Sequence, residues 1–520
     1  MKRNRLTFFL CSGLILMALM SACKTEKADV KERPNILFIM SDDHSYQTIS
    51  AYDNRFIETP NIDRIAKDGV VFTNSFVGNS ICGPSRATML TGKHTHINGQ
   101  INNDVTFNGT QETFPKLLHQ SGYQTALIGK WHLKSDPTGF DYWSVVPGQG
   151  QYYNPDFIEM GVEKQYEGYV TTLTTDFAIK WLDKQRDKSK PFCLLLHNKA
   201  PHRTWEPDTA YLDDFEDKTF PLPDNFFDNY EGRQAAEEQH LSIRANDMDL
   251  FYDLKMQDPE GEIKSRFPWY KGHTTRMNDA QKAAWDAHYN PIAEDFKKQN
   301  LSGEELYKWK YQRYMKDYLS CIKSVDENIG RVLDYLEEQG LADNTLIVYT
   351  SDQGFYMGEH GWFDKRFMYE ESFRTPLLMH LPKGYEKRGE ISELVQNIDY
   401  APTFLDVANV KVPNAIQGVS LKPLFQKEEP KEWRKGLYYH YYEFPNEHMV
   451  KRHYGIRTER YKLIHFYNDI DVWELYDLQN DPQEMHNLYG QADYETITQD
   501  LKSQLKELQV EYQDVDQTNY

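Results

Sequence analysis

Four short apolar runs along the chain share one pattern, because each is followed at once by polar residues that suit metals or anions. The runs cover residues 35–40, 124–129, 192–196 and 345–349. Continuous apolar runs of this length, bounded by helical patterns, are typical of strands buried on both faces of a parallel sheet. Ligands bind such sheets beyond the carboxyl ends of the strands, so we expect the four polar clusters to lie together there.

Amphipathic patterns between these runs predict helices that pack on the sheet. Residues 113–120 form one such helix, which ends at Ser121-Gly122, and residues 306–339 repeat apolar side chains at helical spacing up to Gly340. The second pattern predicts one long helix or two helices in series. Residues 205–300 carry many acidic and aromatic side chains without a sustained period, so we expect loops and short helices near the site rather than a separate domain.

The pattern changes from about Trp433 onward. Aromatic segments at 437–442, 454–457 and 461–466 are separated by turn-like stretches and predict antiparallel strands. Residues 476–484 close that sheet, and residues 493–511 form a final amphipathic helix. The predicted fold class is therefore α/β: a large mixed, mainly parallel sheet flanked by helices, then a small C-terminal antiparallel sheet plus helix.

The N-terminal residues have the features of an export signal. Basic residues at positions 2, 3 and 5 precede an apolar run at 6–20, which is short for a membrane span. Residues 19–23 resemble a bacterial lipobox, in which Cys23 is acylated and becomes the mature N-terminus. The alternative is an ordinary signal peptide that is cut nearby.

These features predict four regions: a lipoprotein signal peptide at 1–22, a tether at 23–33, a catalytic domain at 34–430 and a C-terminal subdomain at 431–520. We expect the mature protein in the periplasm or on the surface of a Gram-negative bacterium. Its contact with the membrane would be made only through a lipid anchor at Cys23.

Net charge limits the kinds of binding partner, and cysteine content limits the possible disulfides. A net charge of −20 argues against nucleic acid as a partner. An anionic substrate would then require Lys, Arg and His side chains gathered locally in a pocket. Three widely spaced cysteines in the predicted mature domain, Cys82, Cys193 and Cys321, predict no disulfide framework.

Residues 81–93 give the most specific indication in the sequence of the reaction that the protein carries out. Cys82 is followed by Pro84, Ser85 and Arg86, and then by Leu90 and Gly92. Pro84 suits the first turn of a helix and Gly92 suits its end, so we expect Cys82 where a loop enters a helix. Backbone N–H groups and the positive end of the helix dipole would then point toward an anion.

This stretch resembles the signature of the type I, formylglycine-dependent sulfatases of the alkaline phosphatase-like superfamily. In that family the cysteine is oxidised after translation to formylglycine, an aldehyde whose hydrate is the nucleophile. The resemblance implies that Cys82 is that residue and that a formylglycine-generating maturation enzyme is a partner. For an isolated cysteine, a buried or helix-start thiol is the alternative.

The polar clusters after the first and last apolar runs offer only oxygen ligands, at Asp42, Asp43, Asp352 and Gln353. Oxygen ligands favour a hard cation, Ca²⁺ before Mg²⁺, over zinc. A solvated turn or a helix cap is the alternative for either pair alone. The resemblance assigns these four positions, with the modified Cys82, to a calcium site, although asparagine is commoner in the family where this chain has Gln353.

The resemblance also implies roles in hydrolysis of a sulfate ester. Arg86, Lys130 and Lys365 would neutralise developing charge together with calcium. His202 would hold sulfate and act as general acid, and His132 would deprotonate the sulfated intermediate. Asp352 occupies the family position that activates the attacking hydroxyl.

Substrate assignment rests on a narrower resemblance. Residues 202–205 and 229–233 resemble the group that contains bacterial N-acetylglucosamine-6-sulfatases. This implies a 6-O-sulfated N-acetylglucosamine of mucin or a heparan-type glycan as the substrate. We name as candidate sugar-binding residues Arg203, Trp205, Asp364, Arg366 and His453.

Two other functions stay open at this point. Relatives with the same cysteine motif hydrolyse phosphonates or phosphodiesters, and a rate comparison on aryl sulfate and aryl phosphonate would separate the two activities. A surface lipoprotein that binds sulfated glycan without turnover is the second alternative. An unmodified Cys82 thiol in protein from the native host would favour it.

Overall fold

A computed structural model describes residues 33–257, 263–428 and 430–515. The four apolar runs are four strands, β1 (Asn35–Ser41), β4 (Gln124–Lys130), β8 (Phe192–Asn198) and β9 (Thr345–Ser351). They lie side by side in the order β9-β1-β8-β4, and all their pairings are parallel. The prediction of a buried parallel sheet is confirmed, because nearly every residue of these strands is buried.

Shorter strands extend this sheet on both sides to ten, in the order β11-β2-β10-β9-β1-β8-β4-β5-β6-β7. Strand β5 continues the parallel pairing, whereas β6, β7 and β10 pair antiparallel with their neighbours. The added strands are β2 (Val70–Phe72), β5 (Tyr142–Val146), β6 (Asp156–Glu159), β7 (Val162–Gln165), β10 (Leu377–His380) and β11 (Gly389–Ile391). A separate two-stranded sheet pairs β3 (Ser75–Phe76) with β12 (Val395–Gln396).

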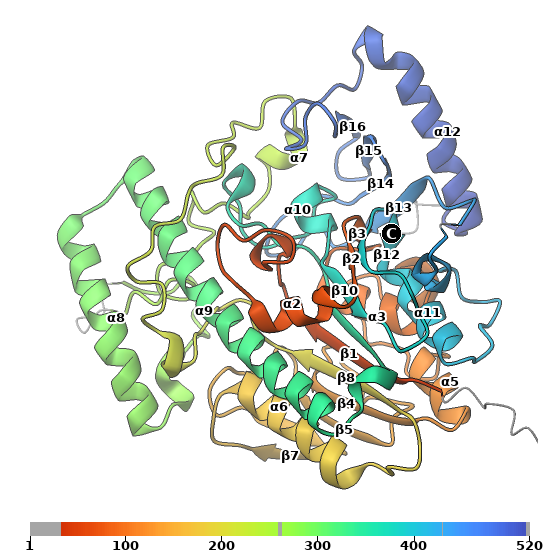
Figure 1. The fold of residues 1–520 in the computed structure, drawn as a ribbon. Coiled ribbons are helices and arrows are strands. Elements are labelled where there is room, and N and C mark those ends of the chain that lie inside the picture. The colour runs from red at the N-terminus through yellow and green to blue at the C-terminus, as the bar shows by residue number, and fades with distance from the viewer. Residues whose placement is uncertain (1–32, 258–262, 429, 516–520) are drawn as a thin grey trace, which may run out of the picture. The chain divides into compact units, whose positions relative to one another are not determined.

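Side chains of β1 alternate between two hydrophobic cores, one on each face of the sheet. Leu37 and Ile39 belong to the core that includes buried residues of α2 (Pro60–Lys67), α6 (Val170–Lys180) and α9 (Gly303–Glu338). Phe38 and Met40 belong to the core on the other face, with α3 (Cys82–Thr91), α5 (Phe114–Gln120) and α11 (Tyr400–Val407). Helices therefore cover both faces, as Figure 1 shows.

The segment predicted as one long helix or two in series is a single helix, α9, of 36 residues. Its buried face packs on the sheet, and its Asp326 carboxylate accepts hydrogen bonds from the backbone N–H groups of Asn61 and Ile62 at the start of α2. This carboxylate satisfies donors that the first turn of a helix leaves unpaired.

The expectation for residues 205–300 is only partly met. Most of the stretch is loop, with a short helix α7 (Gln234–Glu237), but it also contains α8 (Asp279–Gln299), which has 21 residues. Helix α8 packs on α9 through aromatic rings, among them Phe296 and Trp309 with centroids 4.3 Å apart. Its helical period is weak because few of its residues are large and apolar and Pro291 lies inside it.

The C-terminal region forms the predicted antiparallel sheet and helix. Strands β13 (Gly436–Tyr441), β14 (His453–Thr458), β15 (Tyr461–Phe466) and β16 (Val472–Asp477) pair in sequence order. Helix α12 (Glu495–Glu511) packs through Leu501 and Leu505 on Tyr438 and Ile456 of this sheet, and it is the blue helix of Figure 1. The short helices α4 (Thr95–Asn98) and α10 (Glu370–Phe373) complete the α-helices of the described ranges.

The predicted signal peptide at 1–22 and nearly all of the predicted tether at 23–33 lie outside the described residues. Among the residues that are described, no helix is both long enough and apolar enough to cross a membrane. The boundary between 430 and 431 stays a prediction.

We predict that Gly129→Ala in β4 destabilises the protein far more than Gly99→Ala. Both glycines have a positive φ, of 107° and 82°, which strains any L side chain. A Cβ at position 129 would also overlap the backbone carbonyl oxygen of His197, whereas none of the surrounding atoms lies within 4 Å of a Cβ at position 99. We expect a loss of about 3 kcal/mol or more against about 1 kcal/mol. Thermal unfolding measures both, and equal Tm losses would contradict the prediction.

Candidate active site

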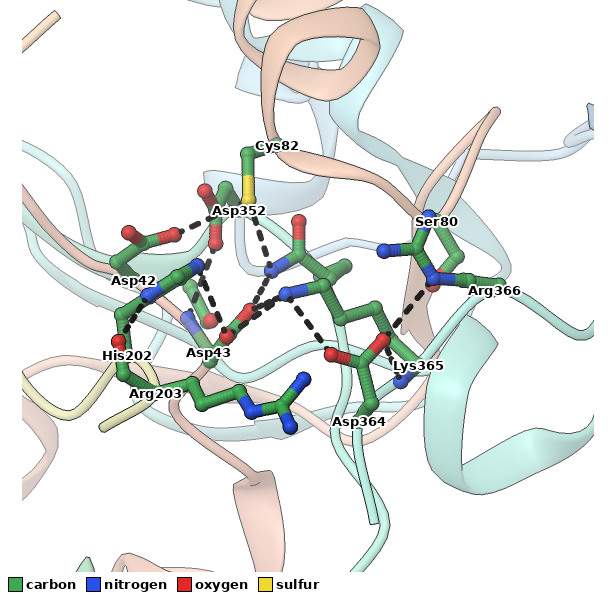
Figure 2. A network of polar contacts seen from close by, with 12 residues as sticks. Asp42, Asp43, Ser80, Cys82, His202, Arg203, Asp352, Asp364, Lys365 and Arg366 are labelled. Carbon is green, nitrogen blue, oxygen red and sulfur yellow. Dashed lines mark hydrogen bonds and ion pairs between the residues drawn. The ribbon is translucent and has the colours of Figure 1, made fainter. Parts of the chain in front are cut away.

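The polar clusters predicted after the four strands do gather at one end of the sheet. Strand β1 leads to Asp42 and Asp43, β4 ends at Lys130, and β9 leads to Asp352. Cys82 is the first residue of α3, and Gly92 ends that helix in the left-handed conformation with a φ of 63°. The helix predicted from Pro84 and Gly92 is therefore confirmed. Figure 2 shows Cys82 above Asp42, Asp43 and Asp352.

Three buried carboxylates form the centre of the site. Asp42, Asp43 and Asp352 each offer an oxygen to one group of atoms that lie within 4.8 Å of one another. The register of the sheet produces this closeness, because Ser41 of β1 pairs with Ser351 of β9. The Cys82 Sγ lies 3.4 Å from Asp42 Oδ1. Such a group of oxygen donors suits a hard divalent cation.

Gln353 places a side-chain amide next to the three carboxylates. Its amide nitrogen donates to Asp43 Oδ1 and lies 4.0 Å from Cys82 Sγ, while its buried Oε1 has no hydrogen-bond partner in the described part of the chain. Exchange of the amide oxygen and nitrogen by a flip would turn that oxygen toward the carboxylates. A cation among the three carboxylates would then have a fourth protein oxygen, so these residues fit a bound Ca²⁺.

Three cationic side chains surround the carboxylates. Arg86 donates to Asp352 Oδ2 from Nε at 3.0 Å, and its Nη2 lies 2.9 Å from the same oxygen and 3.5 Å from Asp42 Oδ1. The Lys130 ammonium contacts Asp42, and Lys365 Nζ lies 2.7 Å from both oxygens of Asp43.

Burial and these cations set the charge of the carboxylates. Burial raises the pKa of Asp43 to about 6, although the Lys365 ammonium opposes this. Burial acts in the same sense on Asp352, but Arg86 and Lys130 outweigh it and hold the pKa of that carboxyl below its usual value. Asp352 is therefore kept ionised more firmly than Asp43.

Two histidines flank the site. His202 Nε2 lies 3.8 Å from Asp43 Oδ2, and its Nδ1 lies 2.6 Å from the carbonyl oxygen of Arg203. His132 Nδ1 is buried and has no hydrogen-bond partner among the described residues. Burial and the nearby lysine charges lower the pKa of both rings well below their usual value, so both are neutral in this arrangement.

A pocket of about 220 Å³ opens above the carboxylates. Cys82, His202 and Lys365 line its inner part, and three of the predicted sugar-binding residues, Arg203, Asp364 and Arg366, line its walls. The structure also brings to this pocket residues that the sequence analysis missed: Asn103, Gln149, Tyr252, Phe267, Trp269, Glu447 and His448.

The position of Trp205 and His453 corrects the prediction that they contact the sugar. Neither lines the pocket, and both are fully buried. Trp205 packs on Tyr314, with centroids 4.7 Å apart. His453 begins β14, where its Nε2 accepts from the Met368 backbone N–H at 3.1 Å and its Nδ1 lies 2.8 Å from the Lys451 carbonyl oxygen. With both nitrogens engaged in the interior, His453 supports the fold.

His448, five residues before His453, faces the pocket in place of His453. Its Nε2 lies 3.5 Å from Asp364 Oδ2, and Asp364 Oδ1 accepts from Arg366 Nε at 3.1 Å. Arg366 also donates to Glu443 Oε1 at 3.0 Å. These side chains form a connected group of donors and acceptors in the pocket wall. His448 precedes β14 in a loop, where no hydrophobic period could indicate which way it points.

Several residues in and around the site have an uncommon backbone conformation. Asp43, His132, Trp205, Asp364 and Arg366 have positive φ values of 64°, 55°, 53°, 74° and 101°. This region of φ is uncommon for residues other than glycine, and it persists where surrounding contacts hold the chain firmly. The site therefore depends on packing that overrides local backbone preference.

Arg203 links the pocket to the loop at 247–253. Its guanidinium donates to Asp253 Oδ1 at 2.6 Å and Oδ2 at 2.9 Å, and to Glu447 Oε1 at 3.0 Å. Cations in and beneath the pocket are thus numerous on a chain whose net charge is −20. The expectation that positive charge is gathered locally is confirmed.

Comparison with known proteins agrees with this geometry. The profile of the family described as "Sulfatase" matches residues 34–410, and that of "N-sulphoglucosamine sulphohydrolase, C-terminal" matches residues 358–511. The N-acetylglucosamine-6-O-sulfatase of Bacteroides thetaiotaomicron is 51% identical over 99% of this chain and 93% of that protein.

Solved structures give the same result. A protein in complex with its substrate D-glucosamine-2-N,6-O-disulfate has 52% sequence identity and a TM-score of 0.90, with 93% of this chain and 99% of that chain covered. The phosphonate monoester hydrolase of Agrobacterium radiobacter, at 21% identity and a TM-score of 0.68, covers 92% of this chain and 96% of that chain, and it shares the fold. The chain therefore belongs to the sulfatase family of the alkaline phosphatase-like superfamily, and it is a hydrolase of sulfuric esters.

Proposed function

We propose that this sulfatase removes the 6-O-sulfate of N-acetylglucosamine in a mucin or heparan-type glycan. The observation that carries the proposal is the division of one pocket between two sets of side chains. Cys82, His202 and Lys365 line it where they contact the buried carboxylates, while Asp364, Arg366 and His448 line it as a second group whose members are linked through Asp364. One set suits a sulfate group and the other suits sugar hydroxyls. The relatives with 51% and 52% identity act on 6-O-sulfated glucosamines, which supports the choice of sugar.

The nucleophile in this proposal is formylglycine at position 82. When present as its hydrate, the aldehyde supplies a hydroxyl for attack on sulfur and a second hydroxyl that lets the product leave. The unmodified thiol is unsuited to this role, because burial raises the pKa of Cys82 and keeps it protonated.

The metal in this proposal is Ca²⁺, held by Asp42, Asp43, Asp352 and Gln353 together with the modified residue 82. When bound, it supplies positive charge that polarises the sulfate group and favours the ionised form of an attacking hydroxyl. In this reading, Lys130 and Lys365 are released from part of their contact with Asp42 and Asp43 and can turn toward the sulfate.

The remaining roles belong to side chains of this chain. Arg86 orients Asp352 through the hydrogen bond from Nε and the ion pair of Nη2, and Lys130 and Lys365 stabilise negative charge on sulfate oxygens as it develops. His202 Nε2 donates a proton to the leaving sugar oxygen, and His132 accepts a proton from the group at position 82. Both histidines begin neutral here, and an approaching sulfate would raise the pKa of His202 toward the protonated form that an acid requires.

Export with a lipid anchor at Cys23 also remains part of the proposal, with the periplasm or cell surface as the location. The basic residues, the apolar run and the lipobox-like segment at 19–23 support it. Mass analysis of the mature N-terminal peptide tests it: a cut elsewhere, with unmodified Cys23, would refute the anchor.

Matured protein should hydrolyse 6-O-sulfated N-acetylglucosamine with a kcat/KM at least about tenfold above that for 2-O- or 3-O-sulfated sugars, a difference of about 1.4 kcal/mol. A site built for one set of hydroxyls leaves buried polar groups unpaired when the ring is attached through another carbon.

Peptide mass analysis should show an aldehyde at position 82. Cys82→Ala should abolish turnover, and Cys321→Ala, which removes a buried thiol in α9, should retain it.

The same assay run with aryl sulfate and aryl phosphonate separates the alternatives. Faster phosphonate hydrolysis would make the protein a phosphonate or phosphodiester hydrolase. Binding of sulfated glycan without any turnover by protein that carries the aldehyde would favour a binding lipoprotein.

Removal of metal should abolish activity, and Ca²⁺ should restore it better than Zn²⁺, because the donors are all oxygen. Asp42→Asn and Asp352→Asn should weaken binding more than Gln353→Asn, since a carboxylate contributes charge and an amide does not. Thermal unfolding gives a reading independent of turnover: Ca²⁺ should raise Tm in the parent and less in the Asp variants. Full activity of metal-free protein would contradict the assignment.

His448→Ala should lower kcat/KM on the sulfated sugar by at least about tenfold, or about 1.4 kcal/mol, and should change it less than about twofold on a small aryl sulfate. His448 lines the pocket and contacts Asp364, which is not one of the three carboxylates at the centre of the site. Asn446→Ala, in the same loop and outside the pocket lining, is the control. Equal losses on both substrates would place His448 in the catalytic machinery or the fold.

A further inference from the structure

A second pocket adjoins the active-site pocket, and the reaction described above does not use it. The two pockets have the same volume, about 220 Å³ each. Trp269 lines both. The lining segments also continue from one to the other, since Gln149 and Arg203 face the first pocket while Gln151 and Glu206 face the second. Two adjacent hollows of equal size suit two adjacent rings of one chain.

The shared residue is built as a platform. The Trp269 side chain is large and apolar, yet 64% of it is exposed. It is held in place by neighbouring rings, with centroids 5.6 Å away for Tyr252 and Phe267 and 6.0 Å for Tyr270. An ordered aromatic ring with an open surface offers dispersion contact and apolar burial to the C–H face of a pyranose.

Polar groups in the second pocket suit a sugar as well. The Tyr270 hydroxyl is buried and has no hydrogen-bond partner in the described part of the chain. Burial, with the Glu206 carboxylate as the next cause, raises the pKa of Tyr270, so this hydroxyl stays protonated. A buried hydroxyl without a partner is unfavourable. A ligand hydroxyl in the pocket would satisfy it.

The charge of the second pocket selects among sugars. Its lining holds two cations, Lys271 and Arg276, against one carboxylate, Glu206. Arg276 Nη2 is paired with Asp156 at 2.9 Å, and Glu206 Oε1 lies 2.9 Å from His273 Nδ1. Among the residues that the structure describes, Lys271 has no ion-pair partner. Because Arg276 and Glu206 already have partners, the ammonium of Lys271 is the group that favours an anionic ligand here.

We propose that the second pocket binds the sugar next to the sulfated glucosamine in the same chain, and that this neighbour carries an acidic group. Trp269 supports the junction between the two rings, Tyr270 bonds a hydroxyl of the second ring, and Lys271 attracts its acidic group. The enzyme then acts on oligosaccharides in preference to the free sulfated monosaccharide. This inference rests on the proposed 6-O-sulfatase function.

The test compares kcat/KM of matured enzyme on 6-O-sulfated N-acetylglucosamine with that on disaccharides in which this sugar is linked to a hexuronate, to a sulfated hexose or to a neutral hexose. We expect kcat/KM on a disaccharide with an anionic second sugar to be at least about tenfold above that on the monosaccharide. The increase should be smaller for the disaccharide with a neutral hexose. The two anionic disaccharides show whether a carboxylate or a sulfate is preferred. Equal values for the monosaccharide and all disaccharides would overturn the inference.

Variants of residues that line only the second pocket sharpen the test. Lys271→Ala should reduce kcat/KM on the hexuronate disaccharide to the value for the neutral disaccharide. Lys264→Ala is the control and should leave kcat/KM unchanged, because Lys264 is an exposed lysine of the same segment that lines neither pocket. Tyr270→Phe removes an unpaired hydroxyl, so folding should not suffer. It should still lower kcat/KM on every disaccharide about fivefold or more, in line with a lost hydrogen bond of about 1 kcal/mol.

The outcome separates this inference from the function on which it rests. Failure to cleave any 6-O-sulfated glucosamine substrate would refute the proposed function. Two results would refute only the binding of a neighbouring sugar in the second pocket. One is turnover of the monosaccharide with no higher kcat/KM on disaccharides. The other is an equal effect of Tyr270→Phe on the monosaccharide and the disaccharides.

Discussion

Three carboxylates buried within a few ångströms of one another are the constraint that shapes the rest of this protein. Like charges at such separation repel strongly, and burial removes the water that would screen them. Asp42 and Asp352 are forced together because they follow paired residues at the ends of adjacent parallel strands. Positive charge must therefore converge on them, and it comes from a helix start, from a third strand and from a loop after β9.

The requirement for positive charge explains why the site draws on distant parts of the sequence. Arg86 lies on α3, Lys130 ends β4 and Lys365 belongs to the loop after β9. Between them they contact all three carboxylates, and Arg86 and Lys130 both reach Asp42. If one cation were lost, an uncompensated buried charge would remain, which is more damaging than the absence of the whole pair. The fold and the site thus stabilise each other through the same contacts.

Much of this arrangement could be predicted from sequence because it depends on strands. Continuous apolar runs identify buried parallel strands, and topology alone then brings their carboxyl ends together. The residues around Cys82, Asp42 and Asp352 therefore needed no knowledge of side-chain direction. The large sheet, the helix at Cys82 and the small C-terminal sheet followed from the same periodic patterns.

The pocket wall could not be predicted in this way, because loops build it. His453 was chosen as a sugar-binding residue, but alternation along β14 turns it into the core, and the loop before that strand directs His448 outward. Trp205 is bulky and follows His202 closely, yet it packs inward on α9. Trp269 lies in a segment with no period at all. Positions of this kind depend on backbone angles such as the positive φ of Arg366, which composition does not reveal.

The burial of Cys82 has a consequence for how the protein is made. Its side chain is 1% exposed, and every residue of α3 around it is buried. A modifying enzyme must bind several residues on either side of its target, and in the folded chain the residues around Cys82 are buried. The proposed conversion to formylglycine at position 82 would therefore compete in time with folding. Under that proposal, a molecule that folded first would keep the buried thiol and stay inactive.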